Sequence, residues 1–426
     1  MLECLRISEL SNGIKVVTLS KPDVESVSVA IRARVGSRNE PEALNGASHF
    51  IEHMLFKGTH RRSAKVISQT IEGQGGVINA FTDKDNTCYY ATVPYEKEAI
   101  ALDVLSDLFY NATFDSKELD RERNVIAEEI RMYDDQPDSV AADQLMSQLW
   151  SGHPLGRTVL GPIDTILSMP RKELLTYRKE QYAPMRTVFS FAGRVNHEKC
   201  VREVSRIAGK LRNPRHLREP EPFTRAIPLD PFALIRRPIQ QTQIAFGWRA
   251  PGVSSGDVSA PFTFLSCVLG ENMSSRLFQS IRERRGLCYS ICSDYTSLTD
   301  CGCLTIAAGC DPAKAYGGAR AILAEIRKLA ERPVGAAELR RTCDYLCGRF
   351  RLRMDSSPAG WVSSRVLFGV DVNAAAVLER YREVTAADIQ AAAQTLTAEA
   401  LAMTVVAPES ALHTAEQWAN LARELV

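Results

Sequence analysis

Residues 46–59 read GASHFIEHMLFKGT, and this stretch carries the most informative pattern in the chain. It predicts a helix with His49 and His53 at positions i and i+4. Side chains at that spacing project from one helical face, and two imidazoles so placed suit one tetrahedral Zn²⁺. Glu52 lies beside them, where it can reach a water at the metal rather than the metal itself. The order H-x-x-E-H is the inverse of H-E-x-x-H and is typical of a class of zinc hydrolases.

Two histidines at this spacing also occur by chance on ordinary helices. The chain has seven histidines, however, and two of them bracket a glutamate in an apolar helix. A catalytic zinc further needs a third protein ligand and one open position. The metal hypothesis therefore depends on a carboxylate elsewhere in the chain.

The segment 115–135, DSKELDRERNVIAEEIRMYDD, is the expected source of that carboxylate. Glu122 and Glu129 share one helical face, two turns apart. Glu128 is rotated by ~100° from Glu129 and is expected to face solvent. We therefore predict Glu129 as the third ligand and Glu122 as a carboxylate that orients the site from behind. An ordinary surface charge is the alternative for Glu122.

Two apolar residues, Val125 and Ile126, lie between these glutamates in the sequence. They predict that the shared helical face is buried. Buried carboxylates need positively charged partners, and a metal ion is one such partner.

Length and composition exclude several other classes of protein. A chain of 426 residues predicts two or three domains. Lys and Arg total 52 against 51 Asp and Glu, so the net charge of +1 gives no general attraction to nucleic acid or to acidic membranes. We therefore expect neither as a partner. No segment approaches the ~18 apolar residues of a membrane span, and the N-terminus does not read as a secretory signal.

The eleven cysteines are an odd number, and a chain of this size needs no disulfides. They indicate free thiols in a reducing compartment, so we expect a cytoplasmic protein. Cys301-Gly-Cys303 and Cys343-x-x-x-Cys347 lack the paired spacing of a structural zinc site.

A proline-rich stretch at 211–232 predicts a linker between two domains of similar size. We expect a zinc-binding domain at 1–210 and a second domain, without the zinc motif, at 233–426. Both halves show strand-like runs, helices, two further strand-like runs and a helix-rich tail, which favours duplication of one α+β unit. Many α+β domains share that coarse order, so a coincidental likeness stays open.

Each half is predicted to be α+β, with a largely antiparallel sheet and helices packed on one face. No glycine-rich phosphate-binding motif opens a helix after a strand, so a nucleotide-binding role has no support.

The segment His49-x-x-Glu52-His53, with a glutamate 76 residues past His53, resembles the pitrilysin–insulinase metallopeptidases, which include the mitochondrial processing peptidases. Further stretches resemble that family in the family's order: GGVINAFTDKDNTCYYATV, RERNVIAEEIRMYDDQP, HPLGRTVLG and SSRLFQSIRERRGLCYS. The resemblance implies a zinc endopeptidase of duplicated α+β domains, with one zinc per subunit.

The resemblance also carries an expectation about assembly. Family members enclose a chamber between two pairs of domains, and this chain is long enough for one pair. It is similar to the short-subunit branch, which includes the mitochondrial processing peptidase beta subunit and bacterial homologues. We therefore expect a homodimer, or a heterodimer with a related chain that lacks the zinc motif.

Residue by residue, the resemblance implies zinc ligands His49, His53 and Glu129, with Glu52 as general base. Asn79 and Ala80 match the strand that contacts substrate in the family, where an extended peptide could add by main-chain hydrogen bonds. The alternative for Asn79 is a strand-end residue that satisfies its own backbone.

Arg282 and Tyr289 match a pair in the second domain that the family associates with substrate carbonyls and the reaction intermediate. A surface arginine and a packed tyrosine are the alternative for these two.

The expected function is zinc-dependent hydrolysis of peptides or unfolded segments in an enclosed chamber. The main alternative is a catalytically idle subunit that binds peptides or serves as a scaffold in a larger complex. A third hypothesis is a presequence-processing subunit paired with a related chain.

Overall fold

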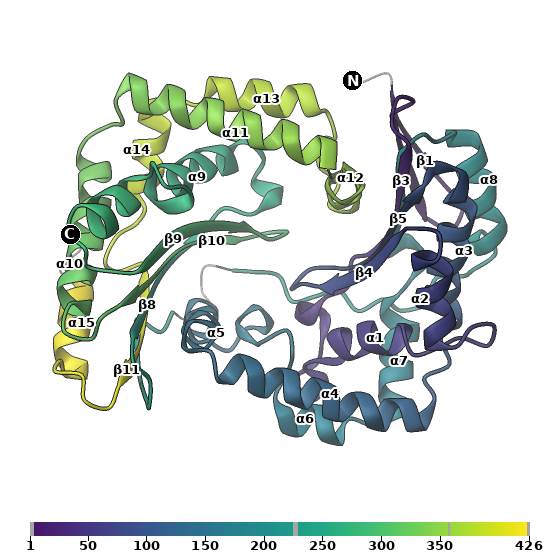
Figure 1. Cartoon of the computed structure of the whole chain (residues 1–426), viewed down its shortest axis with the longest axis horizontal. Helices are drawn as coiled ribbons and strands as arrows, with labels where there is room; N and C mark the ends of the chain where they lie inside the picture. The colour runs from purple at the N-terminus through teal and green to yellow at the C-terminus, as the bar shows by residue number, and fades with distance from the viewer. Residues whose placement is uncertain (1–3, 225–228, 357, 424–426) are drawn as a thin grey trace. The chain divides into compact units, whose positions relative to one another are not determined.

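A computed structural model describes residues 4–224, 229–356 and 358–423, and the chain forms two compact units (Figure 1). The first unit contains the described residues up to Ile130, with Arg157–Glu221 and Leu352–Ala375. The second contains Arg131–Gly156, Pro222–Arg351 and the described residues from Ala376 onward. Each unit therefore draws on both halves of the chain.

The predicted linker at 211–232 contains residues 225–228, which lie outside the described ranges. Its described residues form neither helix nor strand before Phe232, and the chain passes from one unit to the other within it. The domain limits predicted from the sequence stay a prediction.

The sheet of the first unit has the strand order β1-β2-β6-β3-β5-β4. Its strands are β1 (Leu5–Glu9), β2 (Lys15–Ser20), β3 (Ser26–Ala33), β4 (Val77–Thr82), β5 (Thr87–Pro94) and β6 (Thr187–Gly193). The pairing of β2 with β6 is parallel and the others are antiparallel. The edge strand β4 therefore has a partner, β5, on one side only.

Several helices pack around this sheet. They are α1 (Ala47–Leu55), α2 (Ala64–Glu72), α3 (Glu98–Asn111), α4 (Ser116–Asp134), α6 (Ile163–Ser168), α7 (Arg171–Gln181), α8 (His197–Ala208) and α12 (Pro358–Leu367). α1 lies beside β4 and buries its apolar residues Phe50, Ile51, Met54 and Leu55. This packing fixes the helix that carries the histidines.

The second unit repeats the same strand order with one strand fewer, β7-β11-β8-β10-β9. Its strands are β7 (Phe232–Arg237), β8 (Thr242–Ala250), β9 (Ser290–Ser297), β10 (Gly302–Cys310) and β11 (Leu401–Pro408). β7 pairs with β11 in parallel, as β2 pairs with β6. This repeated topology supports duplication of one α+β unit.

The helices that lie wholly or mostly in the second unit are α5 (Pro137–Leu149), α9 (Ser259–Ser266), α10 (Ala315–Glu331), α11 (Ala336–Ser356), α13 (Ala374–Glu383), α14 (Ala386–Gln394) and α15 (Ala415–Arg423). Two π-helical turns, Cys267–Glu271 and Phe278–Glu283, follow α9. The predicted fold class, two α+β units with largely antiparallel sheets, is confirmed.

The structure adds a helix on the second face of each sheet. α12 packs against β2, β3 and β6 on the side opposite α3 and α8, and α5 packs against β8 and β11 on the side opposite α10 (Figure 1). Every residue of β6 and of β11 is buried, and a strand buried on both faces needs cover on both sides. Each covering helix comes from the half of the chain that does not supply the strands it covers.

All eleven cysteines lie in the described ranges, and none of them forms a disulfide. No helix in the described part of the chain is long and apolar enough to cross a bilayer.

Candidate metal centre

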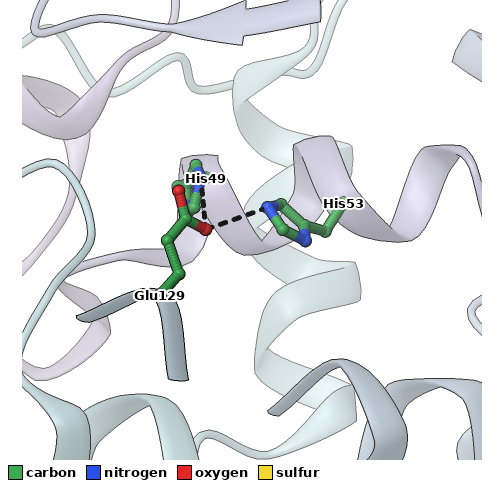
Figure 2. Close-up of side chains that lie close together, drawn as sticks. All are labelled: His49, His53 and Glu129. Atoms are coloured by element: carbon green, nitrogen blue, oxygen red, sulfur yellow. Dashed lines mark ion pairs between the residues drawn. The ribbon is translucent and has the colours of Figure 1, made fainter. Parts of the chain in front are cut away.

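The first unit brings His49, His53 and Glu129 together. Both histidines project from α1 toward Glu129 on α4 (Figure 2). Oε2 of Glu129 lies 3.7 Å from Nε2 of His49 and 3.5 Å from Nε2 of His53. Among the described residues, this trio is the one His, Cys, Asp or Glu cluster whose ligand atoms lie close enough to hold a metal ion.

The spacing of these atoms fits a tetrahedral ion. Two ligands that each stand ~2.0–2.2 Å from zinc are roughly 3.3–3.6 Å apart, close to the two distances to Glu129. Two imidazoles and one carboxylate also form a donor set found in catalytic zinc sites, where a fourth position stays open. The residues therefore fit the zinc that the sequence predicted.

The electrostatics of the two histidines differ. Burial and then the nearby His53 lower the pKa of His49 to about 4, while Glu129 acts in the opposite direction. Burial would also lower the pKa of His53, but its interactions with Glu122 and Glu129 outweigh burial and raise this pKa to about 9. Without a metal, positive charge between these carboxylates is therefore carried by the His53 ring.

Glu122 supports His53 from behind. Its Oε2 lies 3.0 Å from Nδ1 of His53, and its Oε1 lies 2.6 Å from Nζ of Lys57. Burial opposes ionisation of Glu122, but His53 and Lys57 hold its pKa below the ordinary value. A carboxylate on the second ring nitrogen fixes both the tautomer and the ring orientation, so this contact supports the orienting role that stays a prediction for Glu122.

The face of α4 that carries these glutamates is only partly buried. Glu122 and Ile126 are buried, whereas Val125 is 48% exposed. The expectation that Val125 lies on a buried face is wrong: Val125 lies only about 40° from Glu129 around the helix, yet no neighbouring element in the described part of the chain covers it fully, so burial does not extend across the whole face. Glu128 is exposed, as predicted.

Glu52 lies on α1 between the histidines and accepts a hydrogen bond from the hydroxyl of Thr82, the last residue of β4. Burial raises the pKa of Glu52 above its ordinary value, although Thr82 and His53 both lower it. A carboxylate with a raised pKa is a stronger base, which suits a proton acceptor.

Asn79 and Ala80 lie on β4, the edge strand beside α1. Asn79 is exposed, and its Oδ1 accepts a hydrogen bond of 2.8 Å from the backbone N–H of Ala80. This is the local contact expected if Asn79 satisfies its own strand. Their role in binding substrate stays a prediction.

Arg282 and Tyr289 lie together in the second unit. The guanidinium carbon of Arg282 is 5.8 Å from the ring centroid of Tyr289 and 4.6 Å from that of Phe278. The side chain of Tyr289 is 75% exposed, so the packed-tyrosine alternative does not describe it. Their part in catalysis stays a prediction.

Sequence reasoning missed two polar contacts of this site, Thr82 to Glu52 and Lys57 to Glu122. Lys57 lies two residues beyond the end of α1, and its closeness to His53 in the sequence could have found it. Nothing in the local sequence places Thr82 beside Glu52.

Two family models match the chain. One, described as insulinase (peptidase family M16), matches residues 15–163, and the other, described as the peptidase M16 inactive domain, matches residues 168–346. The three residues of the metal centre, His49, His53 and Glu129, all lie within the first match.

Relatives and solved structures agree with these matches. An uncharacterized zinc protease of Streptomyces coelicolor is 34% identical over 423 residues, which cover 95% of this chain and 90% of the relative. An uncharacterized zinc protease of Bacillus subtilis, YmxG, is 35% identical over 349 residues, which cover 81% of this chain and 83% of the relative.

A protease from Helicobacter pylori shares the fold, with a TM-score of 0.85 at 22% identity, over 95% of this chain and 99% of that one. A peptidase M16 inactive domain from Pseudomonas fluorescens does so with a TM-score of 0.87 at 19% identity, over 96% and 100%. These matches confirm the family resemblance predicted from the sequence: the chain belongs to the insulinase family of peptidases, peptidase family M16.

Proposed function

We propose that this protein is a zinc-dependent endopeptidase that hydrolyses peptides or unfolded segments. The observation that carries the proposal is the convergence of His49, His53 and Glu129, with Glu52 on the same helix. The relatives are named zinc proteases, which supports the same activity.

His49, His53 and Glu129 would hold one zinc per chain. Bound zinc supplies Lewis-acid polarisation of a peptide carbonyl and activation of water. Glu122, backed by Lys57, holds the His53 ring so that Nε2 faces the metal position.

Glu52 is the proposed general base. Its carboxylate takes a proton from the attacking water and passes it to the nitrogen of the departing amine. The hydrogen bond from Thr82 fixes one carboxylate oxygen during this transfer.

The free edge of β4 is the proposed binding place for an extended peptide, with Asn79 and Ala80 in contact with it. Arg282 and Tyr289 are the proposed donors to the oxyanion that develops on the scissile carbonyl. The exposure of Tyr289 and its closeness to Arg282 support this assignment.

The proposed assembly is a homodimer that encloses the substrate, with a processing-peptidase heterodimer as the other arrangement. Sedimentation of the purified chain at assay concentration separates the homodimer from a monomer. Eleven cysteines outside any disulfide support a reducing, cytoplasmic location.

The competing function is a catalytically idle peptide-binding subunit, and the match of residues 168–346 to an inactive-domain model suits either function. The test is cleavage of an unfolded polypeptide by the purified chain, followed by mass spectrometry. We expect cleavage that stops after chelation and returns with stoichiometric zinc. A chain that binds zinc and peptide but never cleaves is the idle subunit.

A further inference from the structure

The first turn of α1 is held by a side chain that lies outside the helix. Oε1 of Glu40 accepts a hydrogen bond from the backbone N–H of Ser48 at 2.7 Å. Its Oε2 accepts one from the N–H of Gly46 at 2.7 Å and one from Nδ2 of Asn45 at 3.0 Å. Glu40 is 2% exposed, so these bonds are shielded from water.

Glu40 takes the role of an N-cap side chain, because it accepts hydrogen bonds from backbone N–H groups at the start of α1. The N-cap is Gly46, with φ of 96°, and a Cβ there would lie 2.5 Å from the carbonyl oxygen of Leu160. A serine or aspartate, the usual N-cap, is therefore excluded. A carboxylate at this end also interacts favourably with the helix dipole.

Asn45 extends the same network, because its Nδ2 also donates to the carbonyl oxygen of Thr158 at 3.0 Å. Burial raises the pKa of Glu40 to about 7, although the bonds from Asn45, Ser48 and Gly46 lower it. Burying a carboxylate costs free energy. Here the hydrogen bonds that Glu40 accepts from the backbone of Gly46 and Ser48 and from the side chain of Asn45 offset that cost.

The rings of the two histidines are held in different ways. His53 is fixed through Nδ1 by Glu122. Nδ1 of His49 is buried and has no hydrogen-bond partner among the described residues. Because no protein group holds the His49 ring from behind, its direction is set by its backbone and by packing.

We propose that Glu40 is a positioning residue of the metal centre. It holds the amide of Ser48, directly before His49, and so sets where Nε2 of His49 stands relative to His53 and Glu129. It acts through the backbone of α1 and not as a ligand. This inference rests on the proposed zinc site and adds a residue that the family motif does not contain.

The test is the zinc affinity of Glu40→Gln in the full-length chain, measured by competition with a fluorescent chelator. Glutamine has the same shape but turns an N–H group toward an existing donor, so one side of the network loses its acceptor. We expect the Kd for zinc to rise about 10–100-fold, the range seen when support of a metal ligand is lost.

Glu98→Gln is the matched control. Glu98 is also buried in the first unit, where it pairs with Lys199 on α8 at 3.2 Å. Its loss is expected to lower the thermal stability of the metal-free protein and to leave the Kd for zinc unchanged. If Glu40 only stabilised the fold, Glu40→Gln would likewise lower the thermal stability and leave the Kd for zinc unchanged.

An unchanged Kd in folded Glu40→Gln overturns the inference. If that variant does not fold, Asn45→Ala replaces it, because it removes one of the bonds to Glu40; a several-fold rise in Kd supports the inference and an unchanged Kd overturns it. Wild-type protein that binds no zinc overturns both this inference and the proposed function. Wild-type protein that binds zinc without cleaving peptides overturns the proposed function alone.

Discussion

Oε2 of Glu122 lies 3.0 Å from Nδ1 of His53, while Nε2 of the same ring faces Glu129 at 3.5 Å. The imidazole therefore has a carboxylate on each side, and each has a different task. Glu129 stands where a metal ligand would, and Glu122 fixes the ring. Lys57 balances the charge of Glu122 from its far side.

The Glu122→Gln substitution tests the support of His53. The variant keeps the shape of the side chain but weakens its hold on the Nδ1 proton, so the Kd for zinc should rise about 10–100-fold. Glu118→Gln, in the first turn of α4 where Glu118 pairs with Arg121, is the control and should bind zinc like the wild type. Equal affinities in the two variants would show that Glu122 does not orient His53 for metal binding.

A second prediction tests which of two adjacent glutamates, Glu128 or Glu129, is the metal ligand. Glu129→Gln should lose most of its zinc on gel filtration, because it removes one of three ligands. Glu128→Gln should retain about one zinc per chain, since Glu128 is exposed. Elemental analysis of both purified variants measures this, and equal metal loss would show that the wrong glutamate has been chosen.

The Tyr289→Phe substitution tests the second unit. It removes one hydroxyl and keeps the ring beside Arg282. If the hydroxyl donates to the oxyanion, kcat should fall on the order of 10²-fold with unchanged zinc content. Wild-type turnover on the same peptide would exclude Tyr289 from the chemistry.

Stability in acid should depend on Asp107, on α3. Thr59 and Arg62, in the loop after α1, donate to its Oδ2, and Asn111 donates to Oδ1. Burial opposes ionisation, but these three residues hold the pKa of Asp107 below its ordinary value. The ionised group therefore stabilises the fold above about pH 3.9, its unfolded pKa, and this contribution is lost as the pH falls through the folded pKa.

Thermal unfolding of the metal-free protein between pH 3 and 7 measures this effect. Asp107→Asn should lower the free energy of unfolding by on the order of 2 kcal/mol at pH 7. The difference in this free energy between the variant and the wild type should become smaller toward pH 3. Asp120→Asn, an exposed carboxylate on α4, should change little at any pH. A difference that is constant with pH would mean that the charge of Asp107 is not what stabilises the fold.

The site residues predicted from the sequence are those whose positions follow from regular spacing along a helix. His49, Glu52 and His53 lie within two turns of one helix, and Glu122 and Glu129 lie two turns apart on another. Regular spacing fixes direction within a helix, so these residues could be placed before the fold was known. Val125 shows the limit of this reasoning, because regular spacing does not tell which part of a helix surface neighbouring elements cover.

The contacts missed are tertiary. Glu40 reaches Ser48 across a loop that turns at Gly46, and Thr82 reaches Glu52 only because β4 lies beside α1. Likewise, Arg32 of β3 donates to Ser363 of α12, which comes from the other half of the chain. Hydrophobic periodicity indicates that a helix has an apolar face but does not name the sheet that the face covers.

The most direct test of the account is the turnover of Glu52→Gln at equal zinc content. This variant keeps all three proposed ligands and loses only the group that accepts the proton, so zinc and peptide should bind as in the wild type. The account predicts about one zinc per chain and peptide cleavage reduced by at least about 10²-fold. Cleavage at the wild-type rate by zinc-loaded Glu52→Gln would contradict it.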